Sequence, residues 1–419
     1  MKRLGRLWND VCDVENGVQA VIAGTKGKRG RKETARFLYS DEEVALNPSL
    51  YHQIDPDKAK AYIEKTILPK FQDLSWKPSP PRHRQIFSYS HTKKKGKWRD
   101  IYVPSFDDHI MMHMVMQITM PAFTRGMHPN CCGSVDGRGT KHILKCGKKW
   151  FQKDPEAKYF VKLDIRHYFD NIDKEILMCK LRNQIKDKYV LQFFSLLMDA
   201  SPVACPLGFY TSPYFANLYL QDLDWFVEQQ LYKERRGKRI KYVKHYLRYM
   251  DDILLIGSSK SDLEKAVKSI IEYARNELGL TIKPTWEIKQ IVHHDNIVGI
   301  WHIPRNQYWC DIGGYKFCKD AVIMRRGIFL ITCRLARKMS RAPCYTLHQC
   351  QSLNSRIGWA SHCDTVYFME EYIEPYVNIP ETRRIIANVA KKRKQRNHQT
   401  TGIRTAQYRR NSAPELYFC

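Results

Sequence analysis

The alternation of apolar and polar positions is most regular in the middle of the chain, where it predicts a small sheet. Residues 158–164 alternate as a strand that ends in Asp164. Residues 246–257 are apolar on both sides of Asp251 and Asp252, a pattern typical of two strands joined by a tight bend. If these segments pair, the three carboxylates come together at one end of the sheet.

Two further regions have strand patterns. Residues 85–91 and 98–104 are joined by the basic, glycine-containing segment 92–97, which predicts a β-hairpin. Residues 291–303 predict strands around Gly299.

Helical spacing of apolar residues predicts most of the remaining elements. Asp173, Ser212 (followed by Pro213) and the capping box 261–264 are expected helix starts. The order through the centre is strand, helix, helix, hairpin, helix, strand, which indicates an α+β fold with helices on one face of an antiparallel sheet. The expected helices are 41–80, 107–124, 173–198, one running from 212 through 226, one starting at 261, and 320 to about 375.

The two ends of the chain are basic. Residues 1–40, with a Gly-Lys-Arg-rich cluster at 24–32, are expected to be a flexible segment that either follows a phosphate backbone or is merely solvated. Basic residues from 383 to 410 form a tail of low hydrophobicity, which is either disordered or folds on RNA.

Charge narrows the class of partner. The chain of 419 residues has 70 Lys and Arg against 43 Asp and Glu, a formal net charge of +27. Together with 12% aromatic residues, this surplus predicts a nucleic-acid partner. The chain has no apolar stretch of membrane-spanning length and no signal-peptide core at its start, so we expect a cytoplasmic protein without a membrane partner.

Thirteen cysteines raise the question of zinc or disulfides, but none form a Cys-x-x-Cys pair. Cys344, His348, Cys350, His362 and Cys363 lie close in sequence, with a spacing that matches no zinc template. We therefore expect reduced thiols.

Two adjacent acids in an apolar hairpin are costly, because buried carboxylates repel each other and lose hydration. Binding of divalent metal explains such a pair, and Asp164 supplies a third carboxylate. Two Mg²⁺ ions about 4 Å apart clamp the attacking and leaving oxygens of a phosphoryl transfer. The carboxylates thus predict nucleotidyl transfer, although nucleases use the same ions.

Five segments together resemble the reverse transcriptase family over roughly residues 85–370. They are Lys93–Arg99 (the fingers hairpin), Phe160–Asp173 (the first catalytic segment), Leu207–Tyr219 (template and nucleotide positioning), Tyr249-Met250-Asp251-Asp252 (the signature hairpin) and Val298–Trp301 (the primer grip). The resemblance implies a right-hand polymerase fold with fingers, palm and a helical thumb. Its implied domains are a basic N-terminal segment with helices (1–84), fingers (85–157), palm (158–303, with fingers elements around 173–205), helical thumb (304–378) and a basic tail (379–419).

The resemblance also implies roles for individual residues. Asp164, Asp251 and Asp252 would be catalytic and, with the carbonyl of Ile165, would hold two Mg²⁺ ions, for which Mn²⁺ could substitute. Lys283 is a candidate proton donor to pyrophosphate. The expected dNTP-binding residues are Lys93, Lys95, Arg99, Phe169 (which excludes a 2′-hydroxyl), Leu207 and Gly208. The expected template and primer residues are Arg138, Ser212, Pro213, Asn217, Tyr249, Met250, Gly299 and Trp301.

The chain resembles two groups of bacterial or phage enzymes within this family. Residues 1–16, Leu207 and residues 354–363 look like diversity-generating retroelement enzymes. Ser212-Pro213 and the basic tail favour defence-associated enzymes, which use a partner non-coding RNA against phage. The tail is expected to be too short for a ribonuclease H domain. The expected partners are a dedicated RNA template, an RNA–DNA hybrid and dNTPs, with an accessory protein or a homo-oligomer left open.

Two functions are alternatives to a reverse transcriptase. One is an RNA polymerase that incorporates ribonucleotides, and the other is a non-catalytic RNA-binding scaffold. Phe169 argues against the first, and the three intact acids argue against the second.

Overall fold

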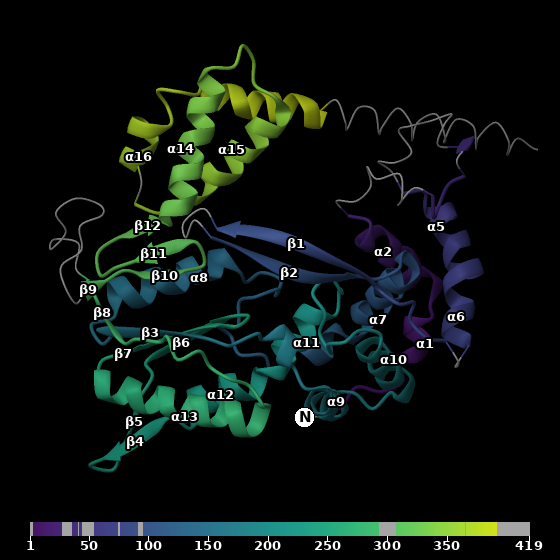
Figure 1. Ribbon diagram of the computed structural model, residues 1–419, viewed down its shortest axis with the longest axis horizontal. Coiled ribbons are helices and arrows are strands. Elements are labelled where there is room, and N and C mark those ends of the chain that lie inside the picture. The colour runs from purple at the N-terminus through teal and green to yellow at the C-terminus, as the bar shows by residue number, and fades with distance from the viewer. Residues whose placement is uncertain are drawn as a thin grey trace, which may run out of the picture. The chain divides into compact units, whose positions relative to one another are not determined.

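The computed structural model describes residues 3–26, 36–40, 42–43, 54–73, 76–90, 95–292, 307–364 and 366–391. The chain divides into two units, Met1–Tyr308 and Trp309–Cys419 (Figure 1).

The first unit begins with helices where the sequence predicted a flexible basic segment. They are α1 (Trp8–Val11) and α2 (Val14–Gly24), and Asp13 caps α2 by accepting the backbone N–H of Asn16 at 3.0 Å. Apolar residues of α2 are buried against α7 (Phe106–Thr124), so the expectation of flexibility was wrong for this part. The basic cluster from 27 to 32 lies outside the described residues.

A helical run then leads to a long hairpin. It consists of α5 (Pro56–Tyr62), the π-helical η2 (Ile63–Ile67) and α6 (Leu68–Gln72), within the predicted helical region. The predicted hairpin is β1 (Arg82–Ser90) and β2 (Lys95–Val103), paired so that Phe87 lies opposite Trp98. The predicted helix at 107–124 is α7, with Met111, Met112 and Met116 fully buried.

The central sheet has five strands in the order β6-β7-β3-β8-β9. Its strands are β3 (Tyr159–Asp164), β6 (His245–Tyr249), β7 (Asp252–Gly257), β8 (Lys289–Ile291) and β9 (Gln307–Tyr308). All neighbouring strands pair antiparallel except β8 and β9, which are parallel. The prediction of a purely antiparallel sheet was therefore wrong for this one pair. Helices α12 (Gln221–Gln229) and α13 (Lys260–Leu278) pack on it, below the strands in the view of Figure 1.

Two predicted long helices are each broken into two. The segment 173–198 forms α9 (Lys174–Gln184) and α10 (Lys188–Asp199), because Asp187 leaves the helical conformation and caps α10 by accepting the N–H groups of Tyr189 and Val190. The segment 212–226 forms α11 (Ser212–Tyr219) and α12, which meet at Leu220. The shorter elements between are α8 (Thr140–Gly147), η3 (Lys148–Gln152), η4 (Phe169–Asn171), β4 (Tyr232–Arg235) and β5 (Lys238–Lys241).

Two predicted helix caps were wrong. Ser212 is the first residue of α11 rather than its cap, and its hydroxyl donates to the carbonyl of Pro206 at 2.8 Å. Helix α13 starts at Lys260, and Ser259 caps it by accepting the N–H of Asp262 at 3.3 Å. Asp173 caps α9 as expected, accepting the N–H of Ile176.

The second unit opens with a sheet rather than with helices. Strands β10 (Cys310–Ile312), β11 (Tyr315–Phe317) and β12 (Val322–Met324) pair antiparallel in that order, so the helical prediction was wrong before residue 326. Helices α14 (Arg326–Ser340), α15 (Leu347–Ala360) and α16 (Val366–Tyr372) follow. Residues 379–391 are also helical, although they fall in the predicted basic tail.

Candidate active site

Strand pairing brings the predicted carboxylates together. In the register of β3 and β7, Asp164 lies directly opposite Asp252. Tyr249 pairs with Asp252 across the β6–β7 hairpin, which leaves Met250 and Asp251 as its two-residue bend. The conditional prediction that the two segments pair is therefore correct, and the acids meet at one end of the sheet.

The bend is held by a loop from an earlier part of the chain. Met250 has a φ of 54°, in the left-handed region, and a Cβ on Gly133 would lie 2.9 Å from the Met250 nitrogen. The backbone N–H of Cys132 donates to the carbonyl of Arg248 at 2.8 Å, and the N–H of Arg248 donates to Asn130 at 3.0 Å. This loop thus continues the sheet beyond β6 and packs on the bend itself.

Two lysines pair with the carboxylates. Lys283 Nζ lies 2.6 Å from Oδ1 of Asp164, and Lys162 Nζ lies 3.2 Å from Oδ1 of Asp252. The backbone N–H of Lys283 also donates to the carbonyl of Asp164 at 2.9 Å. The ammonium groups occupy positions beside the carboxylates where a cation is expected.

The donor chemistry of the site fits a hard divalent cation such as Mg²⁺, which prefers carboxylate oxygens. Oδ1 of Asp164 is buried and, despite the nearby ammonium group, accepts no hydrogen bond within the described residues. Burial and the neighbouring carboxylates of Asp164 and Asp252 raise the pKa of Asp251. In the described part of the chain, however, no three His, Cys, Asp or Glu side chains are already arranged around a metal position.

A buried ion pair supports the hairpin from behind. Arg248 and Asp224 are both fully buried, with Nε and Nη2 of the arginine each donating to the carboxylate at 2.7 Å. Burial opposes the charge of Arg248, but the carboxylate of Asp224 outweighs it and keeps the pKa of the guanidinium well above its ordinary value. Nη1 of Arg248 donates to the carbonyl of Met250 at 3.2 Å, so the pair is tied directly to the bend.

Asn217 and Arg138, expected to contact template or primer, are engaged within the protein. Asn217 is buried, donates to the carbonyl of Gly133 at 2.7 Å and accepts from Nη1 of Arg248 at 3.1 Å. Nη1 of Arg138 donates to the carbonyl of His128 at 2.7 Å. Both residues therefore hold the loop that packs on the bend. Ser212 is buried, and Pro213 follows it in the first turn of α11.

Gly208 makes a close backbone contact that the sequence suggested, but its neighbour is protein. A Cβ at this position would lie 2.3 Å from the carbonyl oxygen of Tyr102, and φ is +116°. Next to it, the carbonyl of Leu207 accepts the N–H of Tyr102 at 2.8 Å. The segment 207–208 thus joins the end of β2 to the helices that follow.

The remaining candidates are placed to different degrees. Phe169 is half-buried on η4, beside the ring of Tyr168 at 5.5 Å, and Ile165 is buried. Arg99 is exposed on β2, and Tyr249 is 39% exposed. The backbone of Lys95 lies in β2. Lys93, Gly299 and Trp301 lie outside the described residues.

Comparison with known proteins identifies the central region. Residues 91–285 match the family model described as "Reverse transcriptase (RNA-dependent DNA polymerase)". The chain contains a reverse transcriptase domain. This domain includes the paired strands with all three acids, and its α+β architecture is that of the expected right-hand polymerase fold. The limits of fingers, palm and thumb remain predictions.

The sequence relatives of the reverse transcriptase domain include bacterial proteins. Retron Ec73 reverse transcriptase of Escherichia coli is 27% identical over 214 residues, which cover 49% of this chain and 62% of the relative. Group II intron-encoded protein LtrA of Lactococcus lactis subsp. cremoris is 27% identical over 262 residues, covering 59% of this chain and 42% of the relative. The chain therefore spans only part of the length of these relatives.

Among solved structures, the apo telomerase of Candida tropicalis aligns with 71% of this chain and 59% of its own, at 12% identity and a TM-score of 0.44.

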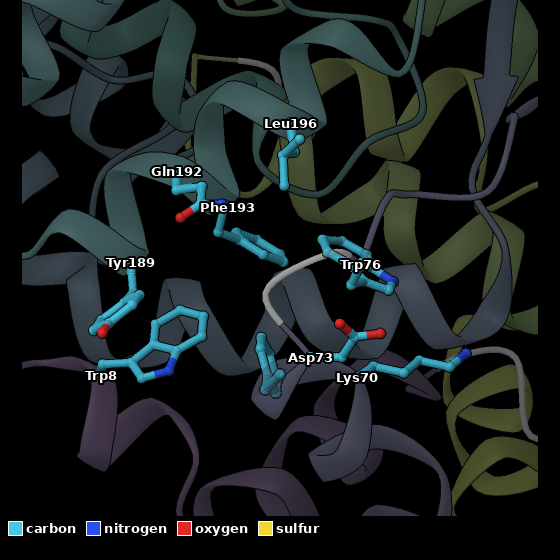
Figure 2. Close-up of a pocket in the computed structure, with 9 residues that line it drawn as sticks. Trp8, Lys70, Asp73, Trp76, Tyr189, Gln192, Phe193 and Leu196 are labelled. Carbon is cyan, nitrogen blue, oxygen red and sulfur yellow. The ribbon is translucent and has the colours of Figure 1, made fainter.

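A pocket in the first unit has no candidate site residue in its lining. This pocket is lined by aromatic residues of α1, α6 and α10 and by Trp76. Figure 2 shows Trp8 beside Tyr189 at one end, with Trp76, Asp73 and Lys70 at the other. It is separate from the carboxylates described above.

Sequence reasoning missed Arg248, Asp224 and Lys162. A signal for Arg248 was present, since a charged residue inside an apolar strand next to the two acids needs a buried partner. Asp224 lies on the polar-looking start of a helix and had no such signal. The alternation of residues 158–164 would have placed Lys162 on the same face as Asp164.

No helix in the described residues is both long and apolar enough to span a membrane.

Proposed function

We propose that the protein is an RNA-directed DNA polymerase, which adds deoxynucleotides to a 3′-hydroxyl along an RNA template. The observation that carries this proposal is the register that sets Asp164 opposite Asp252, next to Asp251. The match of the surrounding residues to the reverse transcriptase family selects polymerisation over the nuclease alternative.

The roles of the residues follow from their chemistry. Asp164, Asp251 and Asp252, with the carbonyl of Ile165, would hold two Mg²⁺ ions. Bound Mg²⁺ would supply positive charge to the attacking and leaving oxygens of the phosphoryl transfer. Lys283 and Lys162, which pair with Asp164 and Asp252, would balance part of the negative charge of the three carboxylates.

Other residues would bind and select the nucleotide. Arg99, with Lys93 or Lys95 of the fingers hairpin, would neutralise the triphosphate. The ring of Phe169 would exclude a 2′-hydroxyl, so that dNTPs are chosen over rNTPs. Leu207 at the base pocket offers no polar contact to the base.

Primer extension tests the proposal directly. Purified protein with an RNA template, a DNA primer, dNTPs and Mg²⁺ is expected to make DNA. The double variant Asp251→Ala/Asp252→Ala is expected to make none, whereas Glu272→Ala/Glu277→Ala, which removes two exposed acids of α13, should retain activity. DNA synthesis by the first variant would rule out the assignment, and preference for rNTPs would favour an RNA polymerase.

We further infer that the template is a dedicated non-coding RNA and that the protein acts in defence against phage. The basic chain and the similarity to a retron reverse transcriptase support the first part. The alternative is the mutagenic enzyme of a diversity-generating retroelement, which the aliphatic Leu207 favours.

Sequencing the nucleic acid that copurifies with the protein separates these roles. One RNA species with faithful DNA copies supports a dedicated template, and heavily substituted copies support diversification. Phage plating on cells with wild-type protein or Asp251→Ala/Asp252→Ala tests defence. If protection and RNA binding both survive loss of the acids, the protein is a scaffold instead.

A further inference from the structure

The hairpin of β4 and β5 is rich in Lys and Arg, and none of these residues belongs to the candidate catalytic site. It lies between α12 and β6, and Arg236 and Gly237 form its two-residue turn. Residues 232–241 contain six Lys and Arg against one Glu. In Figure 1 the hairpin extends below α13, at the edge of the first unit.

The cations at the root of the hairpin are used by the fold. Lys233 Nζ lies 2.7 Å from both carboxylate oxygens of Asp262 on α13. Lys241 donates to Glu228 on α12, and the guanidinium of Arg239 lies 4.6 Å from the ring of Tyr232. Since an isolated two-stranded hairpin is marginally stable in water, these contacts anchor it and hold its direction.

The cations at the tip have no such role. Arg235, Arg236 and Lys238 are exposed and make no ion pair or side-chain hydrogen bond with any described residue. Glu234, the acid within the hairpin, lies 3.9 Å from Arg239 and does not neutralise them. Three positive charges are therefore presented to solvent on a short, anchored support.

The residue at the turn is unusual for its conformation. Arg236 has a φ of 51° and Gly237 a φ of 72°, the backbone of a turn that favours Asn-Gly. An arginine in this left-handed conformation costs about 1 kcal/mol. Where a sequence breaks a local rule of this kind without a structural gain, a functional reason is expected.

The tip lies far from the carboxylates. The chain passes from β5 to the start of β6 at His245, and the catalytic bend is at the other end of β6, beyond Tyr249. The five residues of β6 span roughly 17 Å at about 3.4 Å per residue. A phosphate held by the tip is thus not one of those at the position of nucleotide addition beside Asp164.

We propose that the tip of the β4–β5 hairpin binds the phosphate backbone of a folded RNA stem outside the catalytic site. A-form RNA is recognised through its backbone and shape rather than its deep, narrow major groove, which suits three exposed cations on a narrow support. This inference rests on the proposed RNA-handling function and assigns a place where a structured part of the RNA is anchored.

The salt dependence of RNA binding tests the inference. The tip variant Arg235→Gln/Arg236→Asn/Lys238→Gln removes three charges and places a residue favoured by the turn at 236, so the fold is expected to be kept or stabilised. The control, Lys260→Gln/Lys265→Gln/Arg275→Gln, removes three exposed charges from α13. The probe is a labelled RNA stem-loop, with melting temperature measured in parallel.

We measure the RNA association constant K between about 50 and 200 mM salt. Relative to wild type, the negative slope of log K against log salt should become shallower by about 2–3 in the tip variant and by less than about 1 in the control. Arg235→Lys/Arg236→Lys should keep the slope. Equal losses in tip and control variants would overturn the proposal, as would equal competition by a DNA duplex of the same length.

Primer extension on a short annealed primer–template distinguishes this proposal from the polymerase assignment. Wild type and tip variant should extend it equally. Loss of extension in the tip variant would mean that the hairpin holds the copied duplex, which contradicts the inference. If wild type makes no DNA, the polymerase assignment fails while the binding measurement still decides the role of the tip.

Discussion

Asp251 lies in a half-buried bend beside two other carboxylates. Burial, together with the negative charges of Asp164 and Asp252, raises its pKa above the ordinary 3.8. A raised pKa in the folded state means that ionisation of Asp251 opposes folding. Its protonated form contributes stability at pH values below 3.8, and this contribution is lost as the pH rises through the folded-state pKa. The site is therefore electrostatically strained near neutral pH.

The variant Asp251→Asn should relieve this strain. At neutral pH we expect it to melt at a higher temperature than wild type, by roughly 1–2 °C for each kcal/mol released. The gain should disappear at acid pH, where Asp251 is protonated in both states. Thermal melts across this range measure the effect, with Asp170→Asn at an exposed position as the control. An unchanged melting temperature at neutral pH would contradict the predicted strain.

The close contact between Gly208 and Tyr102 leads to a second prediction. The substitution Gly208→Ala combines a φ of +116° with a Cβ 2.3 Å from the carbonyl oxygen of Tyr102. Gly137 has a φ of +72° with nothing within 4 Å of an added Cβ, so Gly137→Ala reports the backbone term alone, about 1 kcal/mol.

We expect Gly208→Ala to destabilise the protein clearly more than Gly137→Ala in chemical denaturation, because the backbone must move. A matching loss in both variants would show that the contact with β2 is unimportant.

The sequence predicted which residues are candidates for the site more often than it predicted which residues they contact. Three acids in apolar strands indicated the candidate metal site, because burial of such charges needs a reason. The engagement of Asn217 with the loop at Gly133, and of Lys283 with Asp164, depends on strand register and loop placement. One-dimensional patterns contain neither quantity.

The β6–β7 hairpin has the candidate catalytic acids at its bend. A buried ion pair between Arg248 and Asp224 holds the hairpin in place. The guanidinium of Arg248 joins Asp224, Asn217 and the carbonyl of Met250. This arrangement connects two helices (α11 and α12), a strand and a bend by one planar group with fixed donor directions. The position of Asp251 therefore depends on a buried side chain three residues before it.

Removing this support should affect stability and activity separately. Arg248→Met leaves Asp224 as an unpaired buried charge, a loss of about 3–5 kcal/mol. In Arg248→Met/Asp224→Leu the unpaired charge is gone, so most of the stability should return, as measured by denaturant unfolding.

Primer extension by the double variant should stay well below wild type, because the carbonyl of Met250 still lacks its donor. Recovery of both properties together would show that Arg248 serves the fold alone.

Whether a segment is a helix or a strand was easier to predict than the residues at which it begins and ends. The hairpin of β1 and β2 and helix α7 had strong periodic patterns and were predicted correctly. The breaks at Asp187 and Leu220 were not visible, because apolar spacing continues across both. The short strands β10, β11 and β12 have three residues each, too few for a period to be recognised.

The described residues are held together by non-covalent contacts. All described cysteines are free, and only Cys179 and Cys344 among them are exposed. Burial raises the pKa of the thiols of Cys12 and Cys318 to about 11 and that of Cys132 to about 12, which makes them poor nucleophiles at neutral pH. Reduced thiols therefore remain a prediction, which the response to reductant tests.

Reductant should therefore leave the stability of the protein unchanged. We expect the same melting temperature with and without dithiothreitol, and rapid reaction of a thiol reagent at Cys179 and Cys344 but not at buried Cys205. Mass spectrometry of the alkylated protein identifies the sites. A melting temperature that falls on reduction would indicate a disulfide and contradict the prediction.

The pairing of β3 with β7 has a consequence for synthesis of the protein. The two strands are neighbours in the sheet but far apart in the chain, and pairing over such separations is slow. Asp164 leaves the ribosome long before Asp252, so the emerging chain carries a single acid without its companions. Under the proposed function, catalytic competence would thus arise only after β7 has been synthesised, and activity of nascent chains would report when the central sheet closes.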